Sequence, residues 1–232
     1  MTKQRILLVR IGAYGDCIII TPLIRYLKES GNEVYLFTSA ESGVFIFQNN
    51  PYVDKIIPYE KDTVSIDKLG ELLEETKKAY ECNKIIDMCE SIECVLALFP
   101  TQPQYMFPKY ERKVLCDKNY YDYSFEVAGY PEIKGQGRGE LFFSPEEKME
   151  MDSFFYKFRK MFIVLWGLSG SGRNKTYPAT PVVQMDLLNK YPDLLIITVG
   201  DYACRLLESI KHPRFVPMSG EWTMRQSMLA CR

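Results

Sequence analysis

The sequence predicts an α/β fold of two Rossmann-like domains with mainly parallel sheets. The first observation is the opening segment, where branched apolar residues at 5–11 favour a buried strand, a glycine turn follows at 12–16, and a largely apolar helical stretch runs to Gly31. The second observation is that the same strand–turn–helix plan begins again at 161. The third is the alternation of strands and helices between these two segments, which is typical of a parallel sheet.

The elements of the first domain follow from apolar runs and their breakers. Gly31 is expected to end the first helix as its C′ residue. Later strands are expected at 33–38, 53–58 and 84–88, and helices at 40–49 and 62–80. A glycine cluster at 135–139 lies near the expected domain boundary, and Ser144 followed by Pro145 indicates the start of another helix. The expected domains are therefore 1–144 and 161–232, joined by a linker helix at 145–160.

The turn after the first strand has the pattern Gly12-Ala13-Tyr14-Gly15-Asp16. This spacing lacks the Gly-x-Gly-x-x-Gly dinucleotide motif, and the Asp16 carboxylate would repel a pyrophosphate. Two interpretations of Asp16 stay open. It is an N-cap of the following helix, or it is a general base at the carboxyl end of the strand, where ligands of such folds gather.

Composition excludes several classes of function. A net charge of −1 argues against a broad nucleic-acid footprint. The single histidine, His212, leaves little room for catalysis by Ser-His-Asp or Cys-His groups. Seven cysteines without a Cys-x-x-Cys pattern argue against a disulfide framework or structural zinc and favour a reducing cytoplasm. No acidic pair with metal-ligand spacing stands out, so no metal site is expected.

The loop after the strand at 161–166 is suited to an anion. It reads Gly167-Leu168-Ser169-Gly170-Ser171-Gly172-Arg173-Asn174-Lys175, with glycines that let the backbone approach a ligand, hydroxyl donors and two cations. A helix expected from about Ala179 adds a positive dipole end. The pattern is not a Walker A loop, because Gly-Lys-Ser/Thr is absent.

The segment RILLVRIGAYGDCIIITP, from Arg5 to Pro22, resembles the amino-terminal signature of glycosyltransferase family 9, the heptosyltransferases of lipopolysaccharide core assembly. The resemblance implies a GT-B fold, in which two Rossmann-like domains face a cleft. It implies that Asp16, after Gly12 and Gly15, is the catalytic base of an inverting, metal-independent sugar transfer. No cofactor is implied. The donor is a nucleotide diphosphate-sugar, and the acceptor is a hydroxyl of a glycan or a lipid-linked sugar.

The resemblance also implies donor-binding residues in the second domain. Ser169, Gly170, Ser171 and Lys175 match the loop that holds the donor diphosphate, and Tyr177-Pro178 stands in for Trp-Pro. Asp201 is a candidate for the nucleotide ribose. Met224 is a candidate for the base pocket, or is simply an apolar residue at a helix start. A cytoplasmic protein at the inner face of the membrane is the implied location.

Members of the family continue into an Asp/Glu-Thr-Gly motif that this sequence lacks. The second domain is therefore expected to be incomplete, with a partner chain as one means of completing it. The alternative function is a non-catalytic nucleotide- or sugar-binding fragment, or one subunit of a split glycosyltransferase. A redox Rossmann enzyme is disfavoured by the glycine spacing.

Overall fold

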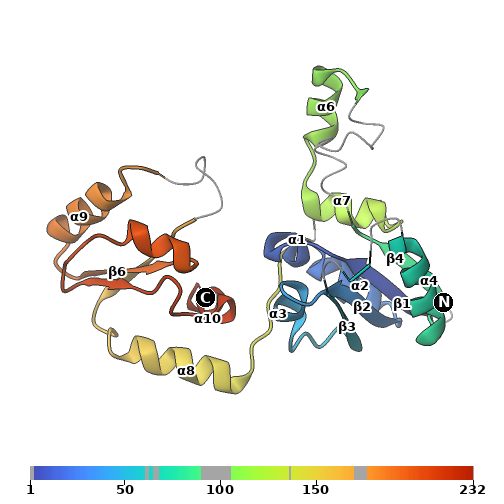
Figure 1. Cartoon of the computed structure of the whole chain (residues 1–232), viewed down its shortest axis with the longest axis horizontal. Helices are drawn as coiled ribbons and strands as arrows, with labels where there is room; N and C mark the ends of the chain where they lie inside the picture. Colours follow the sequence, from blue (N-terminus) through green and yellow to red (C-terminus); the bar gives the residue numbers. More distant parts are fainter. Residues whose placement is uncertain are drawn as a thin grey trace. The chain divides into compact units, whose positions relative to one another are not determined.

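The computed structural model divides the chain into two compact units, Met1–Phe142 and Phe143–Arg232 (Figure 1). It describes residues 3–60, 63–64, 68–89, 106–135, 137–169 and 177–231. Each unit has its own parallel sheet and its own apolar core.

The first unit is built on a four-stranded parallel sheet in the order β3-β2-β1-β4. The strands are β1 (Arg5–Arg10), β2 (Glu33–Ser39), β3 (Lys55–Tyr59) and β4 (Lys84–Asp87). Strand β1 lies inside the sheet, and Leu7, Leu8 and Val9 are fully buried. Apolar side chains on both faces of a strand are expected where helices cover both sides of a parallel sheet.

The first predicted helix is two helices, α1 (Tyr14–Ile19) and α2 (Thr21–Glu29). The break at Ile20 follows from Pro22, which has no N–H to donate and whose ring would clash with the carbonyl of Ile18 in a continuous helix. The hydroxyl of Thr21 donates to that carbonyl at 2.8 Å instead. Gly31 follows α2 with a φ of +88°, so the predicted stop is confirmed. The other helices of the first unit are α3 (Gly43–Phe47), α4 (Leu69–Ala79), α6 (Lys109–Cys116) and α7 (Tyr120–Val127).

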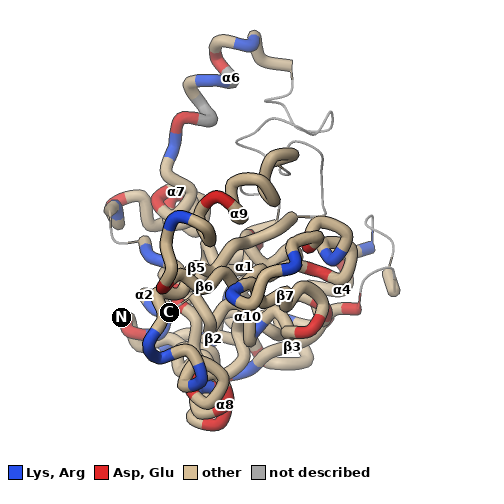
Figure 2. Tube along the Cα trace, turned by 90° about the vertical axis from the view of Figure 1, so that its left-hand side faces the viewer, with Lys and Arg blue, Asp and Glu red and all other residues tan. Residues whose placement is uncertain are grey.

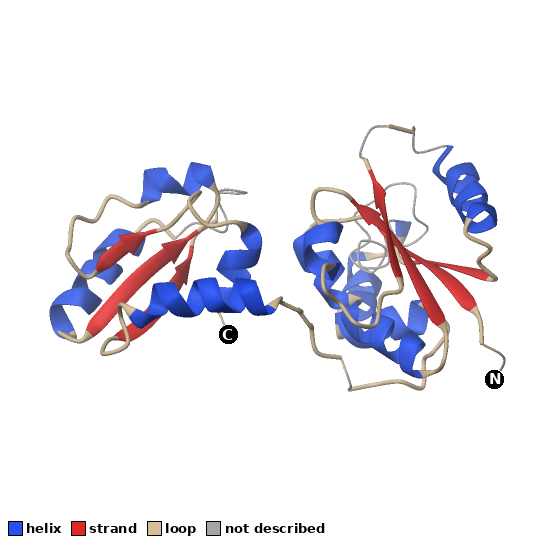
Figure 3. Cartoon of the chain, turned by 90° about the horizontal axis from the view of Figure 1, so that it is seen from below, coloured by secondary structure: helices blue, strands red, loops and turns tan. Residues whose placement is uncertain are grey.

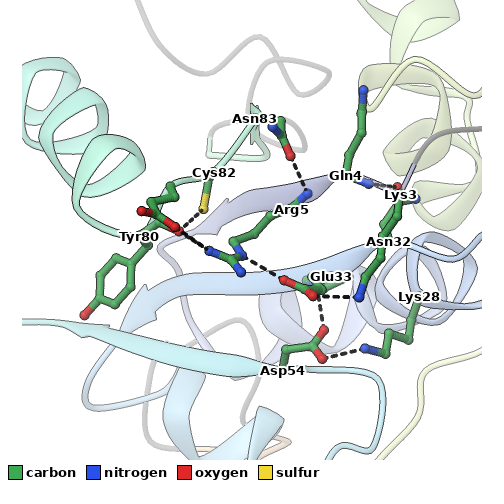
Figure 4. A network of polar contacts seen from close by, with 12 residues as sticks. Lys3, Gln4, Arg5, Lys28, Asn32, Glu33, Asp54, Tyr80, Cys82 and Asn83 are labelled. Carbon is green, nitrogen blue, oxygen red and sulfur yellow. Dashed lines mark hydrogen bonds and ion pairs between the residues drawn. The ribbon is translucent and has the colours of Figure 1, made fainter.

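A set of charged side chains ties the amino ends of the strands together (Figure 4), and we call Lys3, Arg5, Lys28, Glu33 and Asp54 the amino-edge network. Arg5 Nε donates to Glu33 Oε2 at 2.8 Å, and Lys3 Nζ lies 2.7 Å from Glu33 Oε1. Lys28 donates to Asp54, which also accepts from the Val34 N–H. Lys3 and then Arg5 lower the pKa of Glu33 to about 2. Each carboxylate of the network is thus paired with at least one cation.

The second unit has a three-stranded parallel sheet in the order β5-β6-β7 (Figure 3). The strands are β5 (Phe162–Gly167), β6 (Leu194–Val199) and β7 (Phe215–Pro217), and the helical segments are α8 (Pro145–Tyr156), α9 (Thr180–Lys190), η4 (Tyr202–Leu207) and α10 (Met224–Ala230). Helix α8 begins as the sequence predicts, with Ser144 as N-cap and Glu147 closing a capping box.

The sheet of the second unit separates two apolar clusters. One joins α9 to the strands through Leu188, Ile196 and Phe215. The other joins α8 to α10 through Met151 and Leu229. Helix α8 is thus packed into the second unit.

Charges of both signs are interspersed along the trace, in keeping with the net charge of −1 (Figure 2). Within the described part of the chain, no helix combines the length and the apolar character needed to cross a bilayer.

Candidate active site at the carboxyl ends of the strands

The first candidate region is the turn that follows β1. Residues 11–13 connect the last residue of the strand, Arg10, to the start of α1 at Tyr14. Because β1 is an inner strand, its carboxyl end opens between those of β2 and β4. In a doubly wound sheet this is where ligands bind.

Asp16 is the third residue of α1, and the N-cap is Ala13. The prediction that Asp16 is itself the N-cap is therefore wrong. Its carboxylate reaches back along the helix, and Oδ2 accepts the Ala13 N–H at 3.0 Å. The sequence pattern misplaces the cap by three residues because an acid at the third helical position satisfies an amino-terminal N–H as an N-cap does. The side chain is 29% exposed, so one side of the carboxylate faces solvent.

Arg10 lies behind Asp16 and is fully buried. Its Nη2 is 3.4 Å from Asp16 Oδ1, and its Nη1 donates to the Met88 carbonyl at 2.6 Å. Met88 directly follows β4, so the guanidinium connects α1 to the end of the neighbouring strand. Arg10 was not among the site residues predicted from the sequence. The available signal was a charged residue within an apolar strand segment.

The carbonyl of Gly12 is held by the last residue of β2 and by a residue that follows the strand. The hydroxyls of Ser39, at 3.1 Å, and Ser42 both donate to it. The Cys17 thiol approaches the same oxygen at 3.9 Å. The Gly12 N–H in turn donates to Ser39 Oγ at 3.1 Å. These hydrogen bonds hold the turn against the carboxyl end of β2. No local sequence pattern predicts that Ser39 and Ser42 contact Gly12.

Gly12, in the turn, and Gly15, in α1, have different surroundings. A Cβ on Gly12 would lie 2.9 Å from Asp16 Oδ2 and 3.4 Å from Arg10 Nη2. A Cβ on Gly15 would meet no described atom within 4 Å. Gly12 is therefore required by the carboxylate and the guanidinium, whereas Gly15 leaves open space on α1.

Two cysteines beside the turn are kept as neutral thiols. Burial raises the pKa of Cys17 to about 11 and that of Cys89 to about 12. Among the described residues, Cys17, Cys82, Cys89, Cys204 and Cys231 are free thiols. Desolvation suppresses the thiolate, so neither thiol beside the turn is an activated nucleophile.

The second candidate region lies at the carboxyl ends of β5 and β6. Ser169 lines a pocket of about 220 Å³ together with Trp166, Tyr177, Thr180 and Leu206. The pocket is thus bordered by the end of β5, the start of α9 and η4. Ser169 and Tyr177 were predicted from the sequence. Trp166 and Thr180 each lie three residues from one of them but carry no sequence pattern for ligand binding, and Leu206 becomes their neighbour only through the fold.

Asp201 follows β6 and is exposed. Its Oδ1 accepts the Cys204 N–H at 3.1 Å, so it is the N-cap of η4. Gly167 pairs with Val199 in the register of β5 and β6. Ser169 and Asp201 therefore each lie two residues beyond this last pair of the two strands.

Met224 is the first residue of α10 and is 40% exposed. The loop before it lies beside the end of β6, because the Gly220 N–H donates to the Gly200 carbonyl at 2.9 Å. Gly170, Ser171 and Lys175 lie outside the described residues. Among the described residues, no group of three or more His, Cys, Asp or Glu side chains is arranged to hold a metal ion.

No protein-family model and no curated protein matches this sequence. Solved structures do match. A glycosyl transferase of family 9 from Veillonella parvula has a TM-score of 0.71 at 13% identity, covering 98% of this chain and 72% of that chain. The ADP-heptose lipopolysaccharide heptosyltransferase II of E. coli has a TM-score of 0.65 at 14% identity, covering 97% and 76%. The E. coli heptosyltransferase WaaC with ADP has a TM-score of 0.59 at 12% identity, covering 97% and 77%.

Similarity at these identities establishes the fold. The matches cover 97–98% of this chain, so they include the parallel sheets of both units. The sequence resemblance is therefore confirmed at the level of the structure: the chain has the GT-B fold of the family 9 glycosyltransferases.

Proposed function

We propose that the protein is a glycosyltransferase that moves a sugar, heptose or a similar one, from a nucleotide diphosphate-sugar to an acceptor hydroxyl. The acceptor class is a cell-surface glycan or the lipopolysaccharide core. The observation that carries the proposal is the position of Asp16, a partly exposed carboxylate held at the carboxyl end of an inner strand. The donor class is supported by the similar E. coli structures, which are described as using ADP-heptose or containing ADP.

In the proposed reaction, Asp16 accepts the proton of the acceptor hydroxyl as the hydroxyl oxygen attacks the anomeric carbon. The bond from that carbon to the diphosphate breaks, and the nucleoside diphosphate leaves with the electron pair. Each carboxylate oxygen of Asp16 has a second lone pair beyond those facing Ala13 and Arg10, so the carboxylate retains capacity for the proton. Attack from the face opposite the diphosphate inverts the anomeric centre.

On the donor side, Ser169, Gly170, Ser171 and Lys175 are proposed to bind the diphosphate, with Asp201 at the ribose and Met224 at the base. A lysine and backbone N–H groups would stabilise the charge that develops on the leaving diphosphate. The transfer is proposed to need neither a cofactor nor a metal ion, so activity in EDTA is part of the hypothesis. The inner face of the membrane is the proposed place of action.

The decisive experiment replaces Asp16 by Asn. General-base catalysis contributes about 10²–10⁴-fold in rate, so transfer from ADP-heptose to a lipopolysaccharide core acceptor should fall by that factor. The Asn oxygen still accepts the Ala13 N–H, but the ion pair with Arg10 is lost. We therefore expect a loss of roughly 1–3 kcal/mol in the free energy of unfolding. If Asp16 were only an N-cap, the exchange for Asn would change the stability little, because Asn is an equally good N-cap.

Glu33→Gln is the matched control, because Glu33 also pairs with an arginine of β1. It should leave turnover unchanged when rates are normalised to folded protein by ADP titration. Normal turnover of the Asp16→Asn variant would refute the base. Binding of ADP by the wild-type chain with neither transfer nor donor hydrolysis would instead support the non-catalytic or split-subunit alternative.

A further inference from the structure

The buried charge of Arg10 is difficult to explain by packing alone. Its side chain has no exposed surface, and the residues before it in β1, Leu7, Leu8 and Val9, are apolar and equally buried. Removing a charged group from water costs several kcal/mol unless a partner compensates it. An aliphatic residue at this position would avoid that cost, so the guanidinium must have another role.

The contacts of Arg10 point forward to the turn. One end of the guanidinium donates to the Met88 carbonyl at 2.6 Å, which fixes it against the neighbouring strand. Nη2 then lies 3.4 Å from Asp16 Oδ1. The other oxygen of Asp16 accepts the Ala13 N–H at 3.0 Å. The carboxylate is thus located by two groups that lie on different elements.

Gly12 leaves the space in which this arrangement is possible. A Cβ at this position would lie within 3.4 Å of both Asp16 Oδ2 and Arg10 Nη2. The absence of a side chain on Gly12 therefore serves the pair directly.

We infer that Arg10 is a positioning residue, which acts through Asp16 by holding its carboxylate in the orientation needed to accept a proton. The inference rests on the proposed function for its chemical meaning, but the positioning itself is a property of the free protein. Arg10 does not touch substrate in this account. The competing explanation is that Arg10 only joins β1 to the end of β4.

The first test needs no substrate. The exchange rate of the Ala13 amide proton, measured by NMR, reports whether Asp16 Oδ2 stays on that amide. In Arg10→Met we expect exchange to accelerate by about tenfold, the change that accompanies a 1.4 kcal/mol weakening. In Arg10→Lys, which retains the charge, the acceleration should be smaller. Arg5→Met, at the other end of the same strand, should leave the Ala13 rate unchanged. An unchanged Ala13 rate in folded Arg10→Met would overturn the inference.

The second test is a double-mutant cycle with Asp16→Asn, using ADP-heptose and a lipopolysaccharide core acceptor. Arg10→Met alone should lower kcat by about 10–100-fold, as expected for a misplaced catalytic group, with the donor KM within twofold of wild type. Arg10→Lys should recover part of kcat. In the Asp16→Asn background, Arg10→Met should cause no further loss, because its effect passes through Asp16.

The outcomes separate the two hypotheses. Losses that multiply in the double variant, or full turnover of Arg10→Met, would show that Arg10 is only structural. Full turnover of Asp16→Asn would refute the proposed function, and the Ala13 exchange rates would still decide whether Arg10 positions the carboxylate. If Arg10→Met does not fold, the Ala13 exchange rate and the kcat of Arg10→Lys decide between the two hypotheses.

Discussion

Strand β1 begins and ends with an arginine, and the two ends differ in how each arginine meets its carboxylate. At the amino end, Arg5 is 30% exposed and donates to Glu33 at 2.8 Å. At the carboxyl end, Arg10 is completely buried and lies 3.4 Å from Asp16. The two carboxylates have nearly the same exposure, 25% for Glu33 and 29% for Asp16. Exposure therefore does not distinguish a structural acid from a candidate base.

Glu33 and Asp16 differ instead in how many cations contact each carboxylate and how close these cations lie. Glu33 is bound by Lys3 on one oxygen and by Arg5 on the other, and its pKa falls to about 2. Such a carboxylate is a poor proton acceptor. Asp16 is fixed by a backbone N–H and a more distant guanidinium. A carboxylate that is positioned without being saturated by close donors is better suited to general-base catalysis.

The largest difference between the two ends should be seen in stability. Arg10→Met removes the contact with the Met88 carbonyl and the cation beside the partly exposed Asp16, and the loss of a hydrogen bond made by a charged group costs roughly 1.5–3 kcal/mol. Arg5→Met should cost clearly less, since exposed pairs are screened by water. Urea unfolding followed by circular dichroism measures both. Equal losses would mean that the burial of Arg10 has no energetic consequence.

Replacing Gly12, in the turn, and Gly15, in α1, by Ala should change the stability in opposite directions. Gly12→Ala forces Asp16 or Arg10 to move and should cost about 1–3 kcal/mol, the usual range for an overpacked site. Gly15→Ala places a methyl group in open space at the second position of α1 and should add about 0.5–1 kcal/mol of stability. Thermal unfolding of the two variants side by side provides the measurement. A loss of stability in Gly15→Ala would show that the space above α1 is not free.

The smallest effect should come from acid titration of the amino-edge network. The pKa of Glu33 falls from 4.5 to about 2 on folding, so its stabilising contribution is complete above pH 4.5 and disappears as the pH falls towards 2. Glu33→Gln should remove that part of the pH dependence, whereas its stability profile above pH 5 should run parallel to that of wild type. Urea midpoints measured between pH 2 and pH 6 test this. If the urea midpoint of Glu33→Gln depended on pH below 4.5 as strongly as that of wild type, Glu33 would not be the group that loses its stabilising charge there.

Elements with strong local signals were predicted closely from the sequence. The strand expected at 33–38 is observed at Glu33–Ser39, and Ser144 and Gly31 mark a helix start and a helix end as expected. Apolar periodicity and caps are properties of neighbouring residues, so a single sequence contains them. The GT-B fold was predicted from the resemblance of the segment Arg5–Pro22 and of the loop after the strand at 161–166, and it is confirmed by a structural match over 98% of the chain.

The interior of the site was not predictable in the same way. Arg10 approaches Met88 across 78 residues of sequence, and Ser42 approaches Gly12 across 30. No local pattern encodes such pairs. The N-cap prediction for Asp16 failed for the opposite reason, because a cap and a third helical residue carry the same local signal. Only the backbone, in which α1 begins at Tyr14, separates the two.

The Gly12 carbonyl accepts hydrogen bonds from hydroxyl groups at the end of β2 and in the residues after it, which has a consequence for engineering. The peptide 10–16 contains Asp16 but lacks the groups that immobilise its turn, since Ser39 and Ser42 lie 27 and 30 residues further along the chain. Transplanting the motif into another scaffold would move the carboxylate without its supports. The smallest transferable unit is the β1–α1–α2–β2 module extended to Ser42, together with a neighbouring backbone carbonyl in the place of Met88.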